Sequence, residues 1–286
     1  NSGAAYVYIR GTAGWEGPVY LKADNAESGD RFGYSVSLSG DGNTLAVGAT
    51  GEAGMLNTVP GAGAVYLFTR DNAGVWSQAA YLKAAHPDGP GAVSLGDSFG
   101  ASVSLSDNGF TLAIGAPGED GDGVNGETNN ASTDSGAVYV FTRNNAEGSD
   151  WTQQAYLKAG TSDPDAVKAF SEFGRSLSLS GDGKVLATGA WLEDDGTEVE
   201  SGAVYVFSFS TTWDAGIRLR AANLQSNDRF GVSVALSPDG STLAAGAYLE
   251  DGLDNAMQND SGAAYVFVNN GGWSEQAYVK PCLLYT

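Results

Sequence analysis

Apolar and polar residues alternate in short runs along the whole chain, and the runs come in pairs. In residues 34–38, "YSVSL" alternates with a period of two, and the apolar run "TLAVGA" follows after the turn sequence "SGDGN". A second pair, "GAVYLF" and "WSQAAYLKA", begins at Gly63 and Trp76. A period of two is typical of half-buried β-strands, and Asp-Gly or Asn-Gly supplies the positive φ angles of a tight turn. Each pair of runs therefore predicts a β-hairpin.

The first hairpin occurs four times and the second hairpin five times, so the chain is a repeat. Copies of the first hairpin start at Phe32, Phe99, Phe173 and Phe230, and copies of the second start at Gly3, Gly63, Gly136, Gly202 and Gly262. Two hairpins make one four-stranded antiparallel unit, whose strands are named A to D in chain order. Such a unit cannot bury both of its faces alone, whereas units stacked around an axis can.

The repeat predicts an all-β fold, a β-propeller of four-stranded antiparallel blades forming a single domain over residues 1–286. Four complete blades are expected at about residues 30–84, 97–159, 171–221 and 228–280, preceded by a half-blade at 2–23 and followed by a tail at 281–286. The half-blade has strands C and D only. Three completions are open: the tail adds an inner strand, a missing segment belongs to a seven-bladed parent, or a neighbouring chain supplies strands. We favour a five-bladed ring.

Two further features recur at a fixed register and indicate packing between blades. A Gly-Ala pair ends each strand B, where neighbouring backbones approach closely enough to admit only small side chains. A tryptophan starts each strand D and is expected to act as a wedge between blades rather than as a ligand platform. The tryptophans are Trp15, Trp76, Trp151, Trp213 and Trp273.

These motifs resemble the FG-GAP repeat family, the bacterial relatives of the propeller in the integrin α-subunit head. The resemblance rests on "FGASVSLS", "LAIGAPGED", "DSGAVYVF" and "QQAYLKA" in the second blade and covers the chain from Ser2 to Lys280. It implies extracellular adhesion or ligand recognition on a propeller rim. The WD-repeat class is the alternative fold, because "SPDGSTLAAGA" resembles its strand-turn-strand phrase, but the Trp-Asp ending is missing.

Integrin-type blades hold calcium in the A–B turn, and this chain departs from that pattern. The turns here carry only one or two carboxylate-type side chains, whereas Ca²⁺ takes six to eight oxygen ligands. The turn acids are therefore expected to shape the turn only: Asp41, Asp107, Asp182 and Asp239. Acids just before each Phe-Gly, namely Asp30, Asp97 and Asp228 with Ser171 in the third blade, are expected to bind local backbone N–H groups.

Carboxylates concentrate instead in the B–C loops, where a glutamate recurs as Glu52, Glu119, Glu193 and Glu250. The second loop interleaves oxygen donors with glycines, which is the arrangement that a hard cation requires. It predicts a Ca²⁺ site formed by Glu119, Asp120, Asp122, Asn125 and Glu127. The alternative is a solvated loop whose side chains bond their own backbone.

Charge and composition limit the classes of partner and activity that the sequence allows. The formal net charge of −20 argues against nucleic acid as a partner. Cys282 has no partner for a disulfide within the chain, and no apolar run is long enough to span a bilayer. His86 is the sole histidine, and almost every acid is repeated or lies in a loop, so no catalytic residue and no cofactor other than Ca²⁺ is expected.

We therefore expect a non-enzymatic module, extracellular or at the cell surface, that binds a protein or glycan through rim loops. Two alternatives stay open. One is a structural subunit or spacer that self-associates through the half-blade, and the other is a propeller glycoside hydrolase.

Overall fold

The computed structural model describes residues 1–53, 59–85, 96–121, 132–144, 149–160, 168–196, 198–251 and 260–280. Every helix or strand element within these ranges is a β-strand, which confirms the all-β expectation. None of the described segments is a helix with the length and apolarity needed to cross a bilayer.

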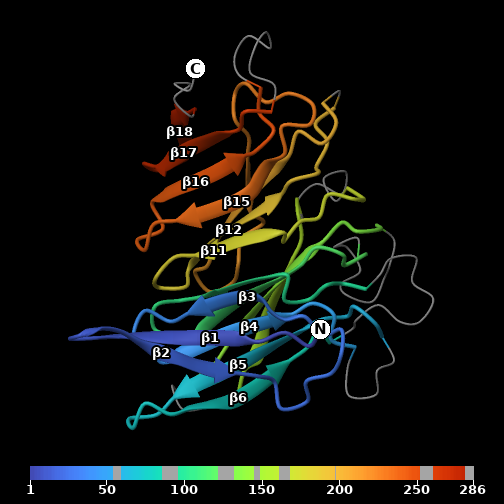
Figure 1. Ribbon diagram of the computed structural model, residues 1–286. Helices are drawn as coiled ribbons and strands as arrows, with labels where there is room; N and C mark the ends of the chain where they lie inside the picture. The colour runs from blue at the N-terminus through green and yellow to red at the C-terminus, as the bar shows by residue number, and fades with distance from the viewer. Residues whose placement is uncertain are drawn as a thin grey trace, which may run out of the picture.

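The strands form four four-stranded antiparallel sheets and one two-stranded hairpin, and the sheets follow one another as the blades of a β-propeller (Figure 1). The half-blade consists of β1 (Ala5–Gly11) and β2 (Gly14–Leu21). The first blade comprises β3 (Phe32–Leu38), β4 (Thr44–Ala49), β5 (Ala64–Arg70) and β6 (Trp76–Leu82). The second comprises β7 (Ser102–Leu105), β8 (Thr111–Ala116), β9 (Ala137–Thr142) and β10 (Thr152–Leu157). The third comprises β11 (Ser176–Leu179), β12 (Val185–Ala190), β13 (Ala203–Ser208) and β14 (Ile217–Leu219). The fourth comprises β15 (Phe230–Leu236), β16 (Thr242–Ala247), β17 (Ala263–Asn269) and β18 (Trp273–Val279).

The A–B turns form as predicted, through an aspartate that bonds the backbone two residues on. Asp41 Oδ1 accepts the N–H of Asn43 at 2.9 Å, and Gly42 has a φ of +67°. The bond from Ser39 Oγ to this carboxylate lowers the pKa of Asp41. In the second blade Asn108 makes the matching bond, to the N–H of Phe110 at 2.9 Å, so the prediction that Asp107 has this role is wrong.

Aromatic side chains fill the space between successive blades. In the first blade the ring of Phe32 meets Tyr66 and Phe68 edge-on, at centroid distances of 5.5 and 5.9 Å. Trp76 joins the same cluster and is 8% exposed, and residues of the half-blade close the cluster from the other side. Trp151, Trp213 and Trp273 lie in the three following junctions, which confirms their wedge role. Trp15, which no other blade of the described residues covers, is 69% exposed.

The Gly-Ala pairs lie where two backbones touch, as expected. A Cβ added to Gly48 would lie 2.0 Å from the carbonyl oxygen of Gly100 in the next blade. Gly115 and Gly189 face matching carbonyls at 2.0 and 1.8 Å. Only the Cα hydrogen of glycine fits at these positions, so the junctions between complete blades depend on glycine.

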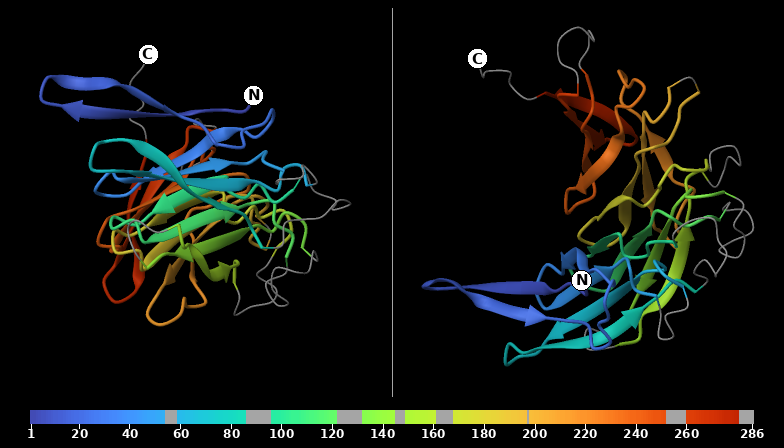
Figure 2. Two further views of the ribbon diagram at one scale, coloured as in Figure 1. Left: turned by 90° about the horizontal axis from the view of Figure 1, so that it is seen from below. Right: turned by 45° about the vertical axis from the view of Figure 1, so that its right-hand side comes forward.

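The blades follow an open arc rather than a closed ring. Figure 2 shows the hairpin β1–β2 at one end of the arc and the sheet β15–β18 at the other. The five-bladed ring is thus not closed by the described residues, and the tail at 281–286 lies outside them.

Candidate functional site

The recurring glutamate of the B–C loop is an internal anchor of each blade. Glu119 is 2% exposed, and its Oε2 lies 2.7 Å from Nζ of Lys158 and accepts the hydroxyl of Tyr156 at 2.8 Å. Lys83 and Lys280 pair with the glutamates of the first and fourth blades in the same way. In each case the cation is the residue directly after strand D, so the glutamate ties the B–C loop to the end of the outermost strand.

The third blade keeps this anchor with different side chains. Arg218 occupies the position of the strand-D tyrosine, and its Nε donates to Glu193 Oε1 at 2.7 Å. Tyr205 of strand C donates its hydroxyl to the same carboxylate at 2.8 Å. Burial raises the pKa of Glu193, and the charge of Arg218 opposes that rise.

Two of the five residues predicted to bind calcium are described, and both already have protein partners. Glu119 is paired with Lys158, and Asp120 Oδ1 accepts the N–H of Asp134 at 2.7 Å. The other three, Asp122, Asn125 and Glu127, lie outside the described residues. Across the described ranges no group of three or more His, Cys, Asp or Glu side chains is arranged to hold a metal ion. The calcium site therefore stays a prediction.

The acids before the Phe-Gly pairs bind backbone N–H groups, as expected. Asp30 Oδ2 accepts the N–H of Glu27 at 2.5 Å, and Asp228 Oδ2 accepts that of Gln225 at 2.7 Å. Ser171 instead donates its hydroxyl to the carbonyl of Lys168 at 2.6 Å. These residues are structural.

Functional candidates appear where the repeat is broken. Three positions vary between the blades: the residue before Phe-Gly, the residue after Phe-Gly, and the residue after Gly-Ala. The residues before Phe-Gly are Arg31, Ser98, Glu172 and Arg229; those after it are Tyr34, Ala101, Arg175 and Val232; those after Gly-Ala are Thr50, Pro117, Trp191 and Tyr248. A framework that keeps the same turns from blade to blade thus presents side chains that vary at these three positions.

A strained turn positions the first two sets. The residue before Phe-Gly has a left-handed backbone in all four blades, with φ of +57° at Arg31 and +50° at Glu172. Its carbonyl accepts the N–H three residues on, for example Arg175 N–H to Glu172 O at 3.1 Å. In the first and fourth blades the pairing register shifts at this turn. Such bulges redirect side chains and cluster at functional sites.

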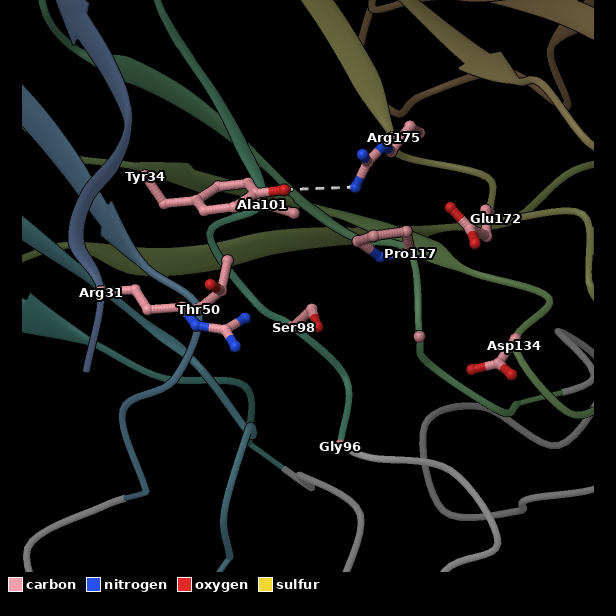
Figure 3. Close-up of a pocket in the computed structure, with 11 residues that line it drawn as sticks. Arg31, Tyr34, Thr50, Gly96, Ser98, Ala101, Pro117, Asp134, Glu172 and Arg175 are labelled. Atoms are coloured by element: carbon pink, nitrogen blue, oxygen red, sulfur yellow. Dashed lines mark hydrogen bonds between the residues drawn. The ribbon is translucent and has the colours of Figure 1, made fainter. Parts of the chain in front are cut away.

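These positions from the first three complete blades line one cavity of about 430 Å³. Arg31 directly precedes β3 and Tyr34 lies near its start, while Glu172 and Arg175 come from the turn before β11. Figure 3 shows Arg31 and Tyr34 on one side, Glu172 and Asp134 on the other, and Ser98 between them. The Arg175 guanidinium reaches across to the hydroxyl of Tyr34, with an N–O distance of 3.4 Å.

The charged groups of the cavity differ in how they are held. Glu172 is fixed by the indole N–H of Trp191, which donates to Oε2 at 2.8 Å. The guanidinium of Arg175 lies 5.7 Å from the centre of the Trp191 ring. Arg31 forms no side-chain hydrogen bond or ion pair with any described residue, and the buried hydroxyl of Thr50 also lacks a partner among them. The cavity thus contains two cations, Arg31 and Arg175, and two carboxylates, Glu172 and Asp134, of which Glu172 is oriented by Trp191.

Sequence reasoning missed Glu172, Arg31 and Arg175. The search for catalytic acids looked for carboxylates outside the repeat, whereas Glu172 stands inside it, at a position where the other blades have arginine or serine. Aligning the four Phe-Gly turns and asking which columns vary would have found all three residues.

The fold is similar to that of several solved propellers. The periplasmic gluconolactonase of Pseudomonas aeruginosa superposes with a TM-score of 0.55 at 17% identity, over 100% of this chain and 67% of that one. A Bacteroides uniformis protein named as a candidate 6-phosphogluconolactonase gives 0.50 at 12% identity, over 93% and 61%. A Lactobacillus plantarum protein gives 0.54 at 14% identity, over 97% and 65%. The chain therefore spans about two thirds of the length of these structures.

The similar structures contradict the expectation of a non-enzymatic adhesion or ligand-recognition module. Two of them are named as lactonase-type enzymes, and none of the three is named as an adhesion protein, a spacer or a glycoside hydrolase. At identities below 25% the likeness itself establishes the fold. The expectation was wrong because it rested on the residues that recur in every repeat and gave no weight to the residues that vary between repeats.

Sequence comparison places the chain in a family. No curated protein sequence matches it significantly. The sequence model of the FG-GAP repeat matches four times, over residues 15–68, 76–141, 151–207 and 213–267, which together are most of the chain. Each match runs from strand D of one blade through strands A, B and C of the next. The chain belongs to the FG-GAP repeat family.

Proposed function

We propose that the chain carries the active site of a hydrolase that opens the lactone ring of an anionic sugar derivative. The observation that carries this proposal is the meeting of Glu172 with Arg31 and Arg175 in one cavity, at positions where the repeat is broken. The names of two similar propellers, a gluconolactonase and a candidate 6-phosphogluconolactonase, support this reaction class.

Glu172 is the proposed general base. Its carboxylate accepts a proton from a water molecule while the water oxygen forms a bond to the lactone carbonyl carbon. The bond between that carbon and the ring oxygen then breaks, and Glu172 returns the proton to the departing alkoxide. The products are a hydroxyl and a carboxylic acid, which ionises. The bond from Trp191 holds Glu172 Oε2, which leaves Oε1 to face the water.

The two arginines are proposed to bind negative charge. A guanidinium presents several N–H donors in a plane that fits a carboxylate or a phosphate. Arg31 makes no side-chain hydrogen bond to another residue of the described ranges, and Arg175 is oriented by Tyr34. One arginine can stabilise the oxyanion that develops on the carbonyl, while the other holds the anionic substituent. In a protein of net charge −20, these two guanidinium groups are the cations that the cavity offers to an anionic substituent, beside the carboxylates of Glu172 and Asp134.

A location outside the cytoplasm is part of the same proposal. It is supported by the periplasmic gluconolactonase among the similar structures.

The test is hydrolysis of glucono-δ-lactone and of its 6-phosphate, followed by acid release and corrected for spontaneous opening. We expect turnover with the parent chain and a loss of about 100-fold or more in kcat for Glu172→Gln, because general-base catalysis contributes at least that much. Glu16→Gln is the matched control, since Glu16 is an exposed carboxylate on β2 outside the cavity. Equal rates for the parent and Glu172→Gln would overturn the proposal.

A further inference from the structure

Three hydrogen-bond donors without a protein partner line one part of the cavity. They are the side chains of Arg31, Thr50 and Ser98. Figure 3 shows Arg31 and Thr50 on the side opposite Glu172 and Asp134, with Ser98 between the two sides. Among the described residues, no group accepts a hydrogen bond from the guanidinium of Arg31 or from the hydroxyl of Ser98. This part of the cavity therefore has donors that a ligand can use.

The main chain brings these three residues together. The residue after Thr50 donates its N–H to the carbonyl of the residue before Arg31, at an N–O distance of 3.0 Å. Ser98 donates its own N–H to a carbonyl in the B–C loop of the first blade, at 2.9 Å. Arg31 and Ser98 also have left-handed backbones, with φ of +57° and +54°. Such conformations are unfavourable for residues with a side chain and cluster at ligand sites. The turns thus hold the donors at the cavity without using their side chains.

The hydroxyl of Thr50 is the least expected of the three donors. Thr50 is 5% exposed, and its Oγ1 is buried with no hydrogen-bond partner in the described part of the chain. A buried hydroxyl without a partner lowers stability, so its presence needs another explanation. The repeat does not require it, because the other three blades have Pro117, Trp191 and Tyr248 at this position. An acceptor on a ligand in the cavity would satisfy it.

The chemistry of the three donors fits a phosphate monoester. A guanidinium binds two oxygens of one anion in a plane, which is enough to satisfy a carboxylate. A phosphate monoester has a third terminal oxygen and carries about two negative charges at neutral pH, so it can accept further hydrogen bonds from hydroxyl groups. Glu172 and Asp134 repel such a dianion, which directs it to the side of the cavity that holds Arg31.

We propose that Arg31, Thr50 and Ser98 form a subsite for the phosphate group of a sugar phosphate lactone. The inference rests on the proposed function, and it names the substrate of that site as the phosphorylated lactone rather than the neutral one. With the phosphate at Arg31, the lactone carbonyl is directed toward Glu172. Arg175 shares the turn of Glu172, since its N–H donates to the Glu172 carbonyl at 3.1 Å, and is left to stabilise the oxyanion.

The first test is ligand binding by the intact chain, measured by calorimetry in a phosphate-free buffer. The probes are inorganic phosphate, D-glucose 6-phosphate and D-glucose. We expect saturable binding of both phosphates and binding of glucose that is weaker by about tenfold or more. Arg31→Met, Thr50→Val and Ser98→Gly are each expected to weaken binding of D-glucose 6-phosphate about tenfold, since a hydrogen bond to a charged group contributes about that much. Arg10→Met, at an exposed arginine of β1 outside the cavity, is the control and leaves binding unchanged.

Thermal unfolding distinguishes a ligand site from a structural role. Valine has nearly the shape of threonine and lacks the unpaired hydroxyl. Thr50→Val is therefore expected to unfold at the same temperature as the parent or higher, while it binds D-glucose 6-phosphate less tightly. A lower unfolding temperature for Thr50→Val overturns the proposal, and so does unchanged binding in Arg31→Met.

The subsite and the proposed function can fail separately. Phosphate binding with the losses given above, in a chain that opens no lactone, supports the subsite and contradicts only the proposed function. Lactone opening with the same KM for glucono-δ-lactone and its 6-phosphate, together with no binding of D-glucose 6-phosphate, overturns the subsite and leaves the proposed function standing.

Discussion

Lys158 Nζ lies 2.7 Å from Glu119 Oε2, with 1% of the lysine side chain and 3% of the glutamate side chain exposed. The pair joins the loop after β8 to the residue that directly follows β10, the outermost strand of the same blade. Burial lowers the pKa of Lys158, and Glu119 opposes this shift. A charge pair with so little access to water depends on both partners, because either charge alone would be buried without compensation.

Removing one member of this pair is expected to destabilise the second blade strongly. Glu119→Met leaves the Lys158 ammonium buried without a countercharge, and we expect a loss of about 3–5 kcal/mol in the free energy of unfolding. Chemical denaturation measures it. The double variant Glu119→Met, Lys158→Met is expected to be more stable than Glu119→Met alone, and a double variant that is less stable would contradict this account.

The third blade provides a matched comparison. Glu193→Met is expected to cost less than Glu119→Met, about 1–2 kcal/mol, because 32% of the Arg218 side chain reaches solvent. Arg218 also retains Asp195 at 3.6 Å as a second carboxylate. The same denaturation measurement applies, and equal losses in the two blades would show that burial of the cation does not set the cost.

Glycine at the end of strand B is expected to matter only where another blade follows. Gly48→Ala forces a Cβ to within 2.0 Å of the Gly100 carbonyl oxygen and is expected to cost about 2 kcal/mol or more. Gly246→Ala meets only the flexible hydroxyl of Ser233 and is expected to change stability by less than about 0.5 kcal/mol. Thermal unfolding of the two variants compares them. A large loss for Gly246→Ala would indicate that the far end of the arc is covered in solution.

Stability is expected to depend on pH through Asp228, which is 2% exposed. Burial raises the pKa of Asp228 from 3.8 to about 6, and the nearby Glu250 adds to the rise. Between these two values the folded chain binds more protons than the unfolded chain, so the contribution of Asp228 to stability falls as the pH rises.

The variant Asp228→Asn removes this titration. Relative to the parent, it is expected to be more stable by about 1–3 kcal/mol at pH 7.5 and unchanged below pH 3.8. Denaturant unfolding at a series of pH values gives the difference curve. A difference that does not vary with pH would mean that Asp228 keeps an ordinary pKa in the folded chain.

The fold could be predicted from the sequence because the residues that determine it are close together in the chain and recur in every repeat. An Asp-Gly turn, an alternating strand and a Gly-Ala ending are each readable within about ten residues, and repetition removes the ambiguity of a single copy. Even the wedge role of Trp76 follows from register alone. The buried pair of Glu119 and Lys158 was harder to predict, since its members lie 39 residues apart. The sequence alone does not distinguish a buried acid or lysine from an exposed one.

The candidate site was not predicted because function here depends on exceptions to the repeat. Glu172 and Arg31 occupy the same column of the repeat, and their convergence in one cavity follows from the stacking of blades, which no single repeat shows. The openness of the arc also depends on contacts between distant segments. The exposure of β1 cannot be predicted from its own sequence, because the exposed Tyr6 and the buried Tyr66 lie in nearly identical sequences.

The most direct test of the central claim combines turnover and binding on one variant, Glu172→Gln. We predict that this variant binds 6-phosphogluconate, the ring-opened product, as tightly as the parent to within about twofold, because the arginines that hold the anion are unchanged, while its kcat for the lactone falls about 100-fold or more. Unchanged turnover in Glu172→Gln, or a parent chain that neither binds the product nor opens the lactone faster than buffer, would contradict the account.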